Sequence, residues 1–272
     1  MSAALGAVVT GIDLRAPSDG DIGAIHRALL GHGVLFFRGQ PLSDDEHLSL
    51  AARFGDPAVF PLVERFAGAG NPLGYITDTA ESPPDADGWH TDITWIETPP
   101  KMAFLQAVAI PERGGDTMWA DLYAAYDALS DPMQALCRHL HVVHTVSPVI
   151  VEAFRARAGD DLADKIATEF PPVVHPLVRT HPETGRDALF VSGAFMTGID
   201  GMHEDESATV LGFLNRHVED PNLHVRWSWT PGDLAIWDER CTNHRALSDH
   251  YPQFRQMRRC TVRGDRPFGP SA

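Results

Sequence analysis

The sequence lacks any uninterrupted apolar stretch close to the roughly 18 residues that a membrane-spanning helix needs. Its first residues also lack the basic segment and apolar core of a secretory signal peptide. We therefore expect a soluble, cytoplasmic protein that does not associate with membranes.

Cysteine is scarce as well. The three cysteines, Cys137, Cys241 and Cys260, are scattered and form no C-x-x-C pair. This number and spacing argue against a disulfide framework and against a zinc ribbon. Reduced thiols in a hydrophobic core are the expected state.

Basic residues are outnumbered, with 22 Lys and Arg against 37 Asp and Glu and a formal net charge of −15. Non-specific binding to nucleic acid or anionic lipid requires clustered positive charge, so both partners are disfavoured. A small-molecule function remains. The chain of 272 residues is 43% hydrophobic and shows no internal repeat, which favours a single domain over residues 1–272.

Hydrophobic periodicity predicts a mainly β protein with peripheral helices, a double-stranded β-helix or jelly roll. Residues 56–88, rich in Pro, Gly and Ala, are expected to form a lid loop with one strand at 74–77. A helical insertion is expected at about 121–168, and residues 224–237 alternate like a β-hairpin. The other expected strands are 7–14, 34–37, 102–109, 173–179, 189–191 and 257–262, and the other expected helices are 19–30, 43–54 and 204–218.

The motif that carries chemistry is His90-Thr91-Asp92, which follows a Pro/Asp-rich loop. On an extended segment, side chains two residues apart point to the same face, so both can reach one divalent ion. A solvated loop histidine beside a capping aspartate is the simpler reading of this pair alone. His244 supplies the partner far downstream, because two histidines and one carboxylate leave the opposite face of a metal open, as in non-haem Fe(II) oxygenases.

The ordered motifs W-H-T-D, G-G-D-T, R-W-S-W-x-P-G-D-x-A-I-W-D-x-R-x-T-x-H and R-x-x-x-R-x-T-V-x-G make this chain resemble the taurine dioxygenase / 2,4-D dioxygenase family. Members of that family are Fe(II)- and 2-oxoglutarate-dependent oxygenases. The resemblance implies that His90, Asp92 and His244 bind Fe(II) and that Thr117 and Arg255 bind the far carboxylate of 2-oxoglutarate. It also implies that O₂ is consumed, that succinate and CO₂ are released and that a substrate C–H bond is hydroxylated.

The proposed 2-oxoglutarate residues have suitable chemistry. An arginine fork matches a carboxylate, and a threonine hydroxyl adds one further bond. Arg255 follows His244 by one hairpin turn, so we expect the two on neighbouring strands. A surface salt bridge for Arg255 and a simple turn motif for Thr117 are the structural alternatives.

Arg259 is the best indication of the substrate. In sulfonate-using members that the chain resembles, the equivalent arginine binds the substrate anion. By strand parity Arg259 shares a face with Arg255, whereas Arg258 faces away. We therefore expect a small organic anion, a sulfonate, sulfate ester or carboxylate.

The lid argues against taurine itself. Phe60, Val63 and Ala86 align with the positions at which taurine-using members of the family carry polar side chains, and Phe195 aligns with an aromatic residue of the family pocket. A small zwitterion would lose polar partners there. A more apolar substrate is expected, although Phe60 and Val63 equally suit ordinary lid packing.

Several alternatives stay open. The same iron chemistry could serve desaturation or oxidative decarboxylation in a biosynthetic pathway, or the chain could be a jelly roll that binds a metal or ligand without turnover. A zinc hydrolase is disfavoured because hydrolysis gives Thr117 and Arg255 no role. The resemblance also makes a homodimer or homotetramer possible. The remaining candidate histidines, expected to be structural, are His141, His144, His175, His181 and His250.

Overall fold

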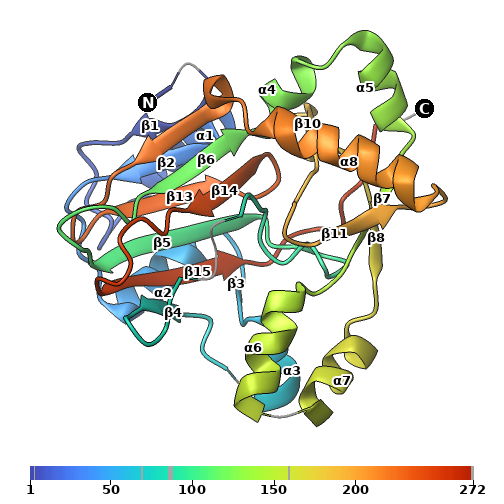
Figure 1. Ribbon diagram of the computed structural model, residues 1–272. Coiled ribbons are helices and arrows are strands. Elements are labelled where there is room, and N and C mark those ends of the chain that lie inside the picture. The colour runs from blue at the N-terminus through green and yellow to red at the C-terminus, as the bar shows by residue number, and fades with distance from the viewer. Residues whose placement is uncertain (3, 69, 85–87, 159, 271–272) are drawn as a thin grey trace.

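Two facing β-sheets form the centre of the molecule (Figure 1). The computed structural model describes residues 1–272 except 3, 69, 85–87, 159, 271 and 272. The larger sheet has the strand order β1-β2-β13-β5-β15-β3, with β4 also paired to β15, and the smaller sheet has the order β12-β6-β14. The larger sheet comprises β1 (Ala7–Val8), β2 (Val34–Phe37), β3 (Pro57–Ala58), β4 (Gly74–Asp78), β5 (Met102–Ala109), β13 (Leu234–Asp238) and β15 (Arg255–Val262). The smaller sheet comprises β6 (Thr117–Asp121), β12 (His224–Trp227) and β14 (Thr242–Ala246).

The central strands of the larger sheet are buried on both faces, which explains why they read as continuous apolar runs. Alternate residues of one strand enter different cores. On β13, Ala235 and Trp237 pack between the two sheets, whereas Leu234 and Ile236 pack beneath the helices. The predicted two-sheet architecture is therefore present.

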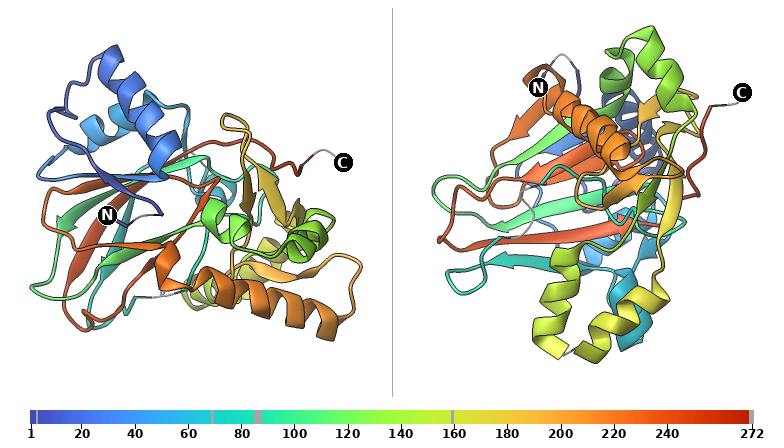
Figure 2. Two further views of the ribbon diagram at one scale, coloured as in Figure 1. Left: turned by 90° about the horizontal axis from the view of Figure 1, so that it is seen from above. Right: turned by 45° about the vertical axis from the view of Figure 1, so that its right-hand side comes forward.

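Two N-terminal helices cover the outer face of the larger sheet (Figure 2, left). Helix α1 (Asp19–His32) begins at a capping box formed by Ser18 and Asp21 and ends at Gly33. Helix α2 (Asp44–Ala52) begins at the predicted capping box of Ser43 and Glu46. Both helices were expected within about two residues of their observed ends.

The rest of the chain forms a flanking part that packs against one end of the two sheets (Figure 1). It contains a three-stranded sheet of order β11-β7-β8, the hairpin β9–β10 and most of the helices. Its strands are β7 (His141–His144), β8 (Val173–Pro176), β9 (Val178–Thr180), β10 (Asp187–Leu189) and β11 (Met196–Ile199). Its helices are α3 (Pro61–Ala67), α4 (Leu122–Asp127), α5 (Asp131–Arg138), α6 (Pro148–Ala158), α7 (Asp160–Glu169), α8 (Glu204–Val218) and the 3-10 turn η1 (Pro221–Leu223).

Three expectations need correction. Residues 56–88 are less irregular than expected, because they contain β3, α3 and β4. Residues 121–168 are not wholly helical, since β7 interrupts them. The segments at 224–237 do not form a hairpin: β12 pairs with β6, whereas β13 pairs with β2 and β5 in the other sheet. Alternation identifies the buried face of a strand but not its partner, which explains this error.

The three cysteines are free thiols and are buried, as expected. In the part of the chain that the structure describes, no helix has both the length and the apolar character needed to cross a membrane.

Candidate active site

The predicted metal ligands come from two segments that the backbone joins directly. His90 and His244 form an isolated antiparallel bridge, in which each backbone N–H donates to the other's carbonyl oxygen, at 3.0 and 2.8 Å. Asp92 begins a turn rather than continuing an extended segment, and the next residue, Ile93, has φ of 55°. Such a conformation is unusual for a β-branched residue, so the turn after Asp92 is tightly constrained by its surroundings.

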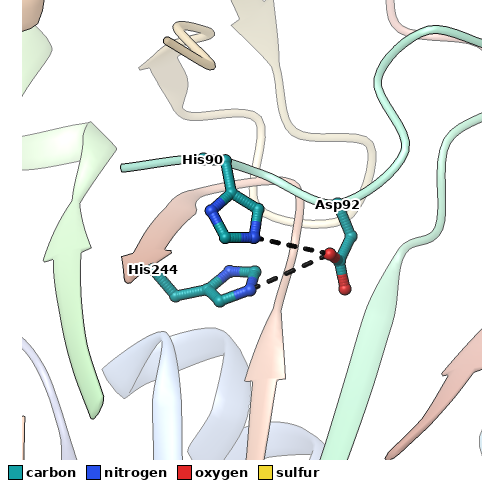
Figure 3. A group of neighbouring side chains, drawn as sticks. All are labelled: His90, Asp92 and His244. Atoms are coloured by element: carbon teal, nitrogen blue, oxygen red, sulfur yellow. Dashed lines mark ion pairs between the residues drawn. The ribbon is translucent and has the colours of Figure 1, made fainter. Parts of the chain in front are cut away.

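The three side chains converge (Figure 3). The Oδ1 atom of Asp92 lies 3.7 Å from Nε2 of His90 and 3.9 Å from Nε2 of His244, and the possible ligand atoms all lie within 4.8 Å of one another. Ligand atoms each about 2.0–2.2 Å from one ion can be up to roughly 4.4 Å apart, and both separations measured from Asp92 lie below that limit. Two imidazoles and one carboxylate on one side of the ion suit Fe(II) and leave its other positions open. The residues present therefore fit the expected metal.

The protonation of the site also suits metal binding. Nδ1 of His90 lies 2.8 Å from the carbonyl oxygen of Gly88, so it donates there and leaves Nε2 for a metal. Burial, and then the neighbouring His90, hold the pKa of His244 well below its usual range. Burial alone would raise the pKa of Asp92, but Arg259 and the two histidines lower it to about 2.

A buried carboxyl group, that of Glu239, binds the backbone of Asp92. Its Oε2 accepts the backbone N–H of Asp92 at 3.0 Å, and its Oε1 accepts the indole N–H of Trp237 at 2.7 Å. Burial and the charge of Asp92 raise the pKa of Glu239 well above its usual range. Sequence reasoning missed Glu239, because nothing in its local pattern separates it from a surface glutamate of the turn between β13 and β14.

Arg259 lies beside the metal ligands. Its Nη1 donates to both carboxylate oxygens of Asp92 at 3.0 Å, and its side chain remains 25% exposed. Arg258 points to the opposite face of β15, where it bonds Asp44 and Gln106. The parity prediction for these two arginines is confirmed.

Thr117 is buried at the start of β6, with Trp229 against it. The indole Nε1–H of Trp229 donates to Oγ1 of Thr117 at 3.0 Å. An indole nitrogen only donates, so the Thr117 hydroxyl accepts this bond and keeps its own proton for another acceptor. That arrangement suits a carboxylate ligand.

Arg255 is 3% exposed and lies on β15. Its Nε donates to the carbonyl oxygen of Gly115 at 3.0 Å. The expectation that Arg255 and His244 occupy neighbouring strands is wrong, because β15 belongs to the larger sheet and β14 to the smaller one. The turn between them crosses from one sheet to the other.

The predicted substrate residues have different surroundings. Phe195 is buried, and its ring lies edge-on to the His90 ring at a centroid distance of 6.2 Å. Phe60 packs edge-on against Trp95 in the same apolar cluster as Phe195. Val63 is 36% exposed on α3, and Ala86 lies outside the described residues.

Three buried histidines that sequence analysis singled out as structural have polar partners of their own. His144 bonds the Thr94 hydroxyl at 2.9 Å, and His181 bonds Asp238 at 3.0 Å. His250 lies 3.1 Å from Asp78. Among the described residues, His90, Asp92 and His244 form the group of side chains able to hold a metal.

Comparisons with known proteins point to one family of dioxygenases. The profile of the taurine catabolism dioxygenase TauD, TfdA family matches residues 1–261. An alpha-ketoglutarate-dependent sulfate ester dioxygenase of Pseudomonas putida is 36% identical, over 97% of this chain and 88% of that protein. An (S)-phenoxypropionate/alpha-ketoglutarate-dioxygenase of Delftia acidovorans is 35% identical, over 90% of this chain and 87% of that protein. The crystal structure of a taurine dioxygenase from Burkholderia xenovorans superimposes with a TM-score of 0.83 at 34% identity, covering 99% of this chain and 91% of the other.

Proposed function

This chain belongs to the taurine catabolism dioxygenase TauD, TfdA family, and from that premise we propose that it hydroxylates a small organic anion more apolar than taurine. The reaction uses Fe(II), 2-oxoglutarate and O₂. The observation that carries the proposal is the buried group of His90, Asp92 and His244 with Arg259 bonded to its carboxylate. The names of the relatives, which mention sulfate esters and phenoxypropionate, support an anion as substrate.

His90, Asp92 and His244 would hold the iron. When bound, the iron couples oxidative decarboxylation of 2-oxoglutarate to hydroxylation of a substrate C–H bond, with release of succinate and CO₂. The chain itself supplies placement. Thr117 and Arg255 would bind the far carboxylate of 2-oxoglutarate, which orients the 2-oxo acid end toward the metal.

Arg259 would bind the substrate anion. Its guanidinium is partly exposed and is held next to Asp92, so an anion that reaches it is brought close to the metal. Because Nη1 is occupied by Asp92, the other end of the guanidinium is assigned to the substrate. A charge-assisted hydrogen bond of this kind is stronger than a neutral one.

The apolar part of the substrate would face the cluster around Phe195. This cluster also contains Leu62, Ile93 and Trp95, with Phe60 packed against it. Burial of an alkyl or aryl group against these side chains is favourable, and the cluster would exclude water from the reaction. The ammonium group of taurine would be desolvated there without a hydrogen-bond partner.

The test is substrate-stimulated succinate formation. Anaerobic protein with Fe(II) and 2-oxoglutarate is exposed to air together with alkyl sulfates, alkyl sulfonates, aryloxyalkanoates, taurine and neutral esters of the same carbon skeletons. We expect stimulation by apolar anions, and loss of all activity in His90→Ala. Identification of the product separates hydroxylation from desaturation and from decarboxylation of the substrate.

Arg259→Ala tests the anion contact. We expect it to raise the KM of an anionic substrate by about tenfold or more, because a charged hydrogen bond is removed, and to change the KM of the neutral ester much less. Arg263→Ala is the matched control, since Arg263, the residue that follows β15, forms exposed ion pairs with Asp56 and Glu64. Equal losses on the charged and the neutral substrate would contradict the anion contact, and no succinate under any condition would contradict the oxygenase.

A further inference from the structure

A buried carboxylate, Asp78, faces the arginine assigned to 2-oxoglutarate. Asp78 is the last residue of β4 and the register partner of Arg255 on β15. It is 6% exposed, and its Oδ2 lies 3.6 Å from Nη1 of Arg255. Two buried, opposite charges are thus aligned by direct strand pairing.

The guanidinium of Arg255 is held from two separate segments. Its Nε donates to the Gly115 carbonyl oxygen in the turn before β6, and Asp78 lies beside Nη1. A guanidinium is planar, with its donors in a fixed fork. Fixing Nε and Nη1 therefore fixes the plane of the whole group and the direction of Nη2.

We propose that Asp78 is a positioning residue that orients Arg255 to receive the far carboxylate of 2-oxoglutarate. The proposal rests on the assignment of Arg255 to 2-oxoglutarate in the proposed function. Arginine loses considerable rotamer freedom when it binds a ligand. Asp78 restricts the rotamers of Arg255 before 2-oxoglutarate arrives. Binding therefore costs less side-chain entropy.

His250 limits the repulsion between Asp78 and the incoming carboxylate. Nε2 of His250 lies 3.1 Å from Asp78, and Nδ1 lies 3.2 Å from the carbonyl oxygen of Leu247. A carboxylate oxygen only accepts, so Nε2 of His250 donates to Asp78. The oxygen that accepts this bond, Oδ2, is also the one that faces Arg255, so its charge is shared between two donors.

The experiment compares two ligands that differ only at the far end. Calorimetry measures the affinity of the Mn(II)-loaded protein for 2-oxoglutarate and for 2-oxopentanoate, which has the same 2-oxo acid end and no far carboxylate. In Asp78→Asn we expect the Kd for 2-oxoglutarate to rise about tenfold, since residues that hold a binding group in place typically contribute 10–100-fold. The Kd for 2-oxopentanoate should change less than about twofold, because that acid does not use Arg255.

Two further variants separate this inference from the proposed function. Arg255→Ala should weaken the binding of 2-oxoglutarate and leave the binding of 2-oxopentanoate unchanged. If 2-oxoglutarate binds as tightly as to the unaltered protein, the assignment of Arg255 fails regardless of Asp78. The double variant Asp78→Asn/Arg255→Ala should bind 2-oxoglutarate no more weakly than Arg255→Ala alone, because Asp78 acts through Arg255.

Remaining controls address folding. Asp187→Asn is the matched substitution, since Asp187 of β10 pairs with Arg138 of α5 in the flanking part, and it should leave both affinities unchanged. Asp78→Glu keeps the charge but displaces it, so an intermediate loss confined to 2-oxoglutarate is expected even if Asp78→Asn folds poorly. Unchanged or tighter binding of 2-oxoglutarate in Asp78→Asn would overturn the proposal, as would an equal loss for both acids.

Discussion

At the scale of single residues, Gly115 combines a constrained backbone with a close approach. Its φ is +72°, and a Cβ placed on it would lie 2.9 Å from Cδ and 3.1 Å from Nε of Arg255. Arg255 therefore reaches the Gly115 carbonyl oxygen across a surface that only glycine leaves open. A side chain here would push the guanidinium away from its present orientation.

Gly115→Ala is expected to weaken 2-oxoglutarate binding, as measured by calorimetry on the Mn(II)-loaded protein. Gly185→Ala is the control, because Gly185 also has a positive φ, +70°, but has open space around its Cα. Both substitutions should lower the free energy of unfolding by about 1–2 kcal/mol through backbone strain. Only Gly115→Ala should raise the Kd for 2-oxoglutarate, and equal Kd values for both variants would refute the close approach.

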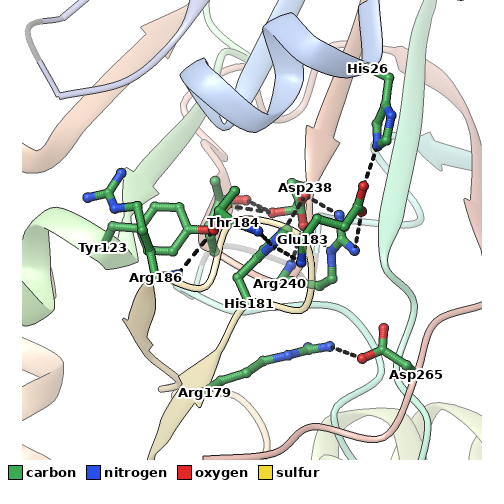
Figure 4. Close-up of polar contacts among 12 residues, drawn as sticks. His26, Tyr123, Arg179, His181, Glu183, Thr184, Arg186, Asp238, Arg240 and Asp265 are labelled. Atoms are coloured by element: carbon green, nitrogen blue, oxygen red, sulfur yellow. Dashed lines mark hydrogen bonds and ion pairs between the residues drawn. The ribbon is translucent and has the colours of Figure 1, made fainter. Parts of the chain in front are cut away.

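At the scale of elements, a buried ionic network fixes the turn that leads to His244 (Figure 4). Asp238, at the end of β13, accepts hydrogen bonds from Arg240 at 2.6 and 2.9 Å and from His181 at 3.0 Å. Arg240 also reaches Glu183 of the β9–β10 hairpin, and Glu183 pairs with His26 of α1. Burial would raise the pKa of Asp238, but Arg240 and His181 hold it below its usual range.

Arg240→Met is therefore expected to lower the free energy of unfolding by about 3–5 kcal/mol, because it leaves the buried charge of Asp238 without its main partner. Arg186→Met offers the comparison on the same hairpin. Arg186 and Asp127 form an exposed ion pair, whose loss should be worth about 1 kcal/mol or less. Urea unfolding measures both, and similar losses would show that the backbone, not the ionic network, holds this turn.

The sequence predicted helix ends correctly, because these depend on neighbouring residues. It did not predict strand pairing, which depends on residues far apart in the sequence. Capping residues and glycines located α1 and α2 closely, because the forces that end a helix act within one turn. Strand pairing was misjudged for β12 and β13, since their alternation is compatible with either sheet. The same limit explains the wrong placement of Arg255 on a strand beside His244.

At the scale of the whole molecule, the sequence separation between contacting residues explains which site residues could be predicted from the sequence. His90 and Asp92 are two residues apart, and together with the motif that contains His244 they can be recognised as metal ligands from the sequence. Glu239 meets Asp92 across 147 positions, and His250 meets Asp78 across 172. Contacts between residues so far apart in the sequence exist only once the two sheets and the turns between them have formed. No local sequence pattern predicts them.

The molecule as a whole is also expected to lose stability in mild acid. Burial lowers the pKa of His47, on the buried face of α2, and of His144, on β7, to about 3 in each case. The usual value is 6.5. Between these values the unfolded chain binds protons that the folded chain excludes. The free energy of unfolding therefore falls as the pH falls from about 6.5 toward 3, by about 1.4 kcal/mol per pH unit for each histidine.

His47→Leu isolates one of these contributions. A leucine cannot bind a proton in either state, so the decline in unfolding free energy between pH 6 and 5 should become shallower by about 1 kcal/mol per pH unit. Urea unfolding at several pH values measures the slope. His141→Gln is the control, because His141 is exposed and should leave the slope unchanged. A slope in His47→Leu as steep as in the unaltered protein would mean that His47 gains its proton without unfolding, with α2 moving enough to admit water to the ring.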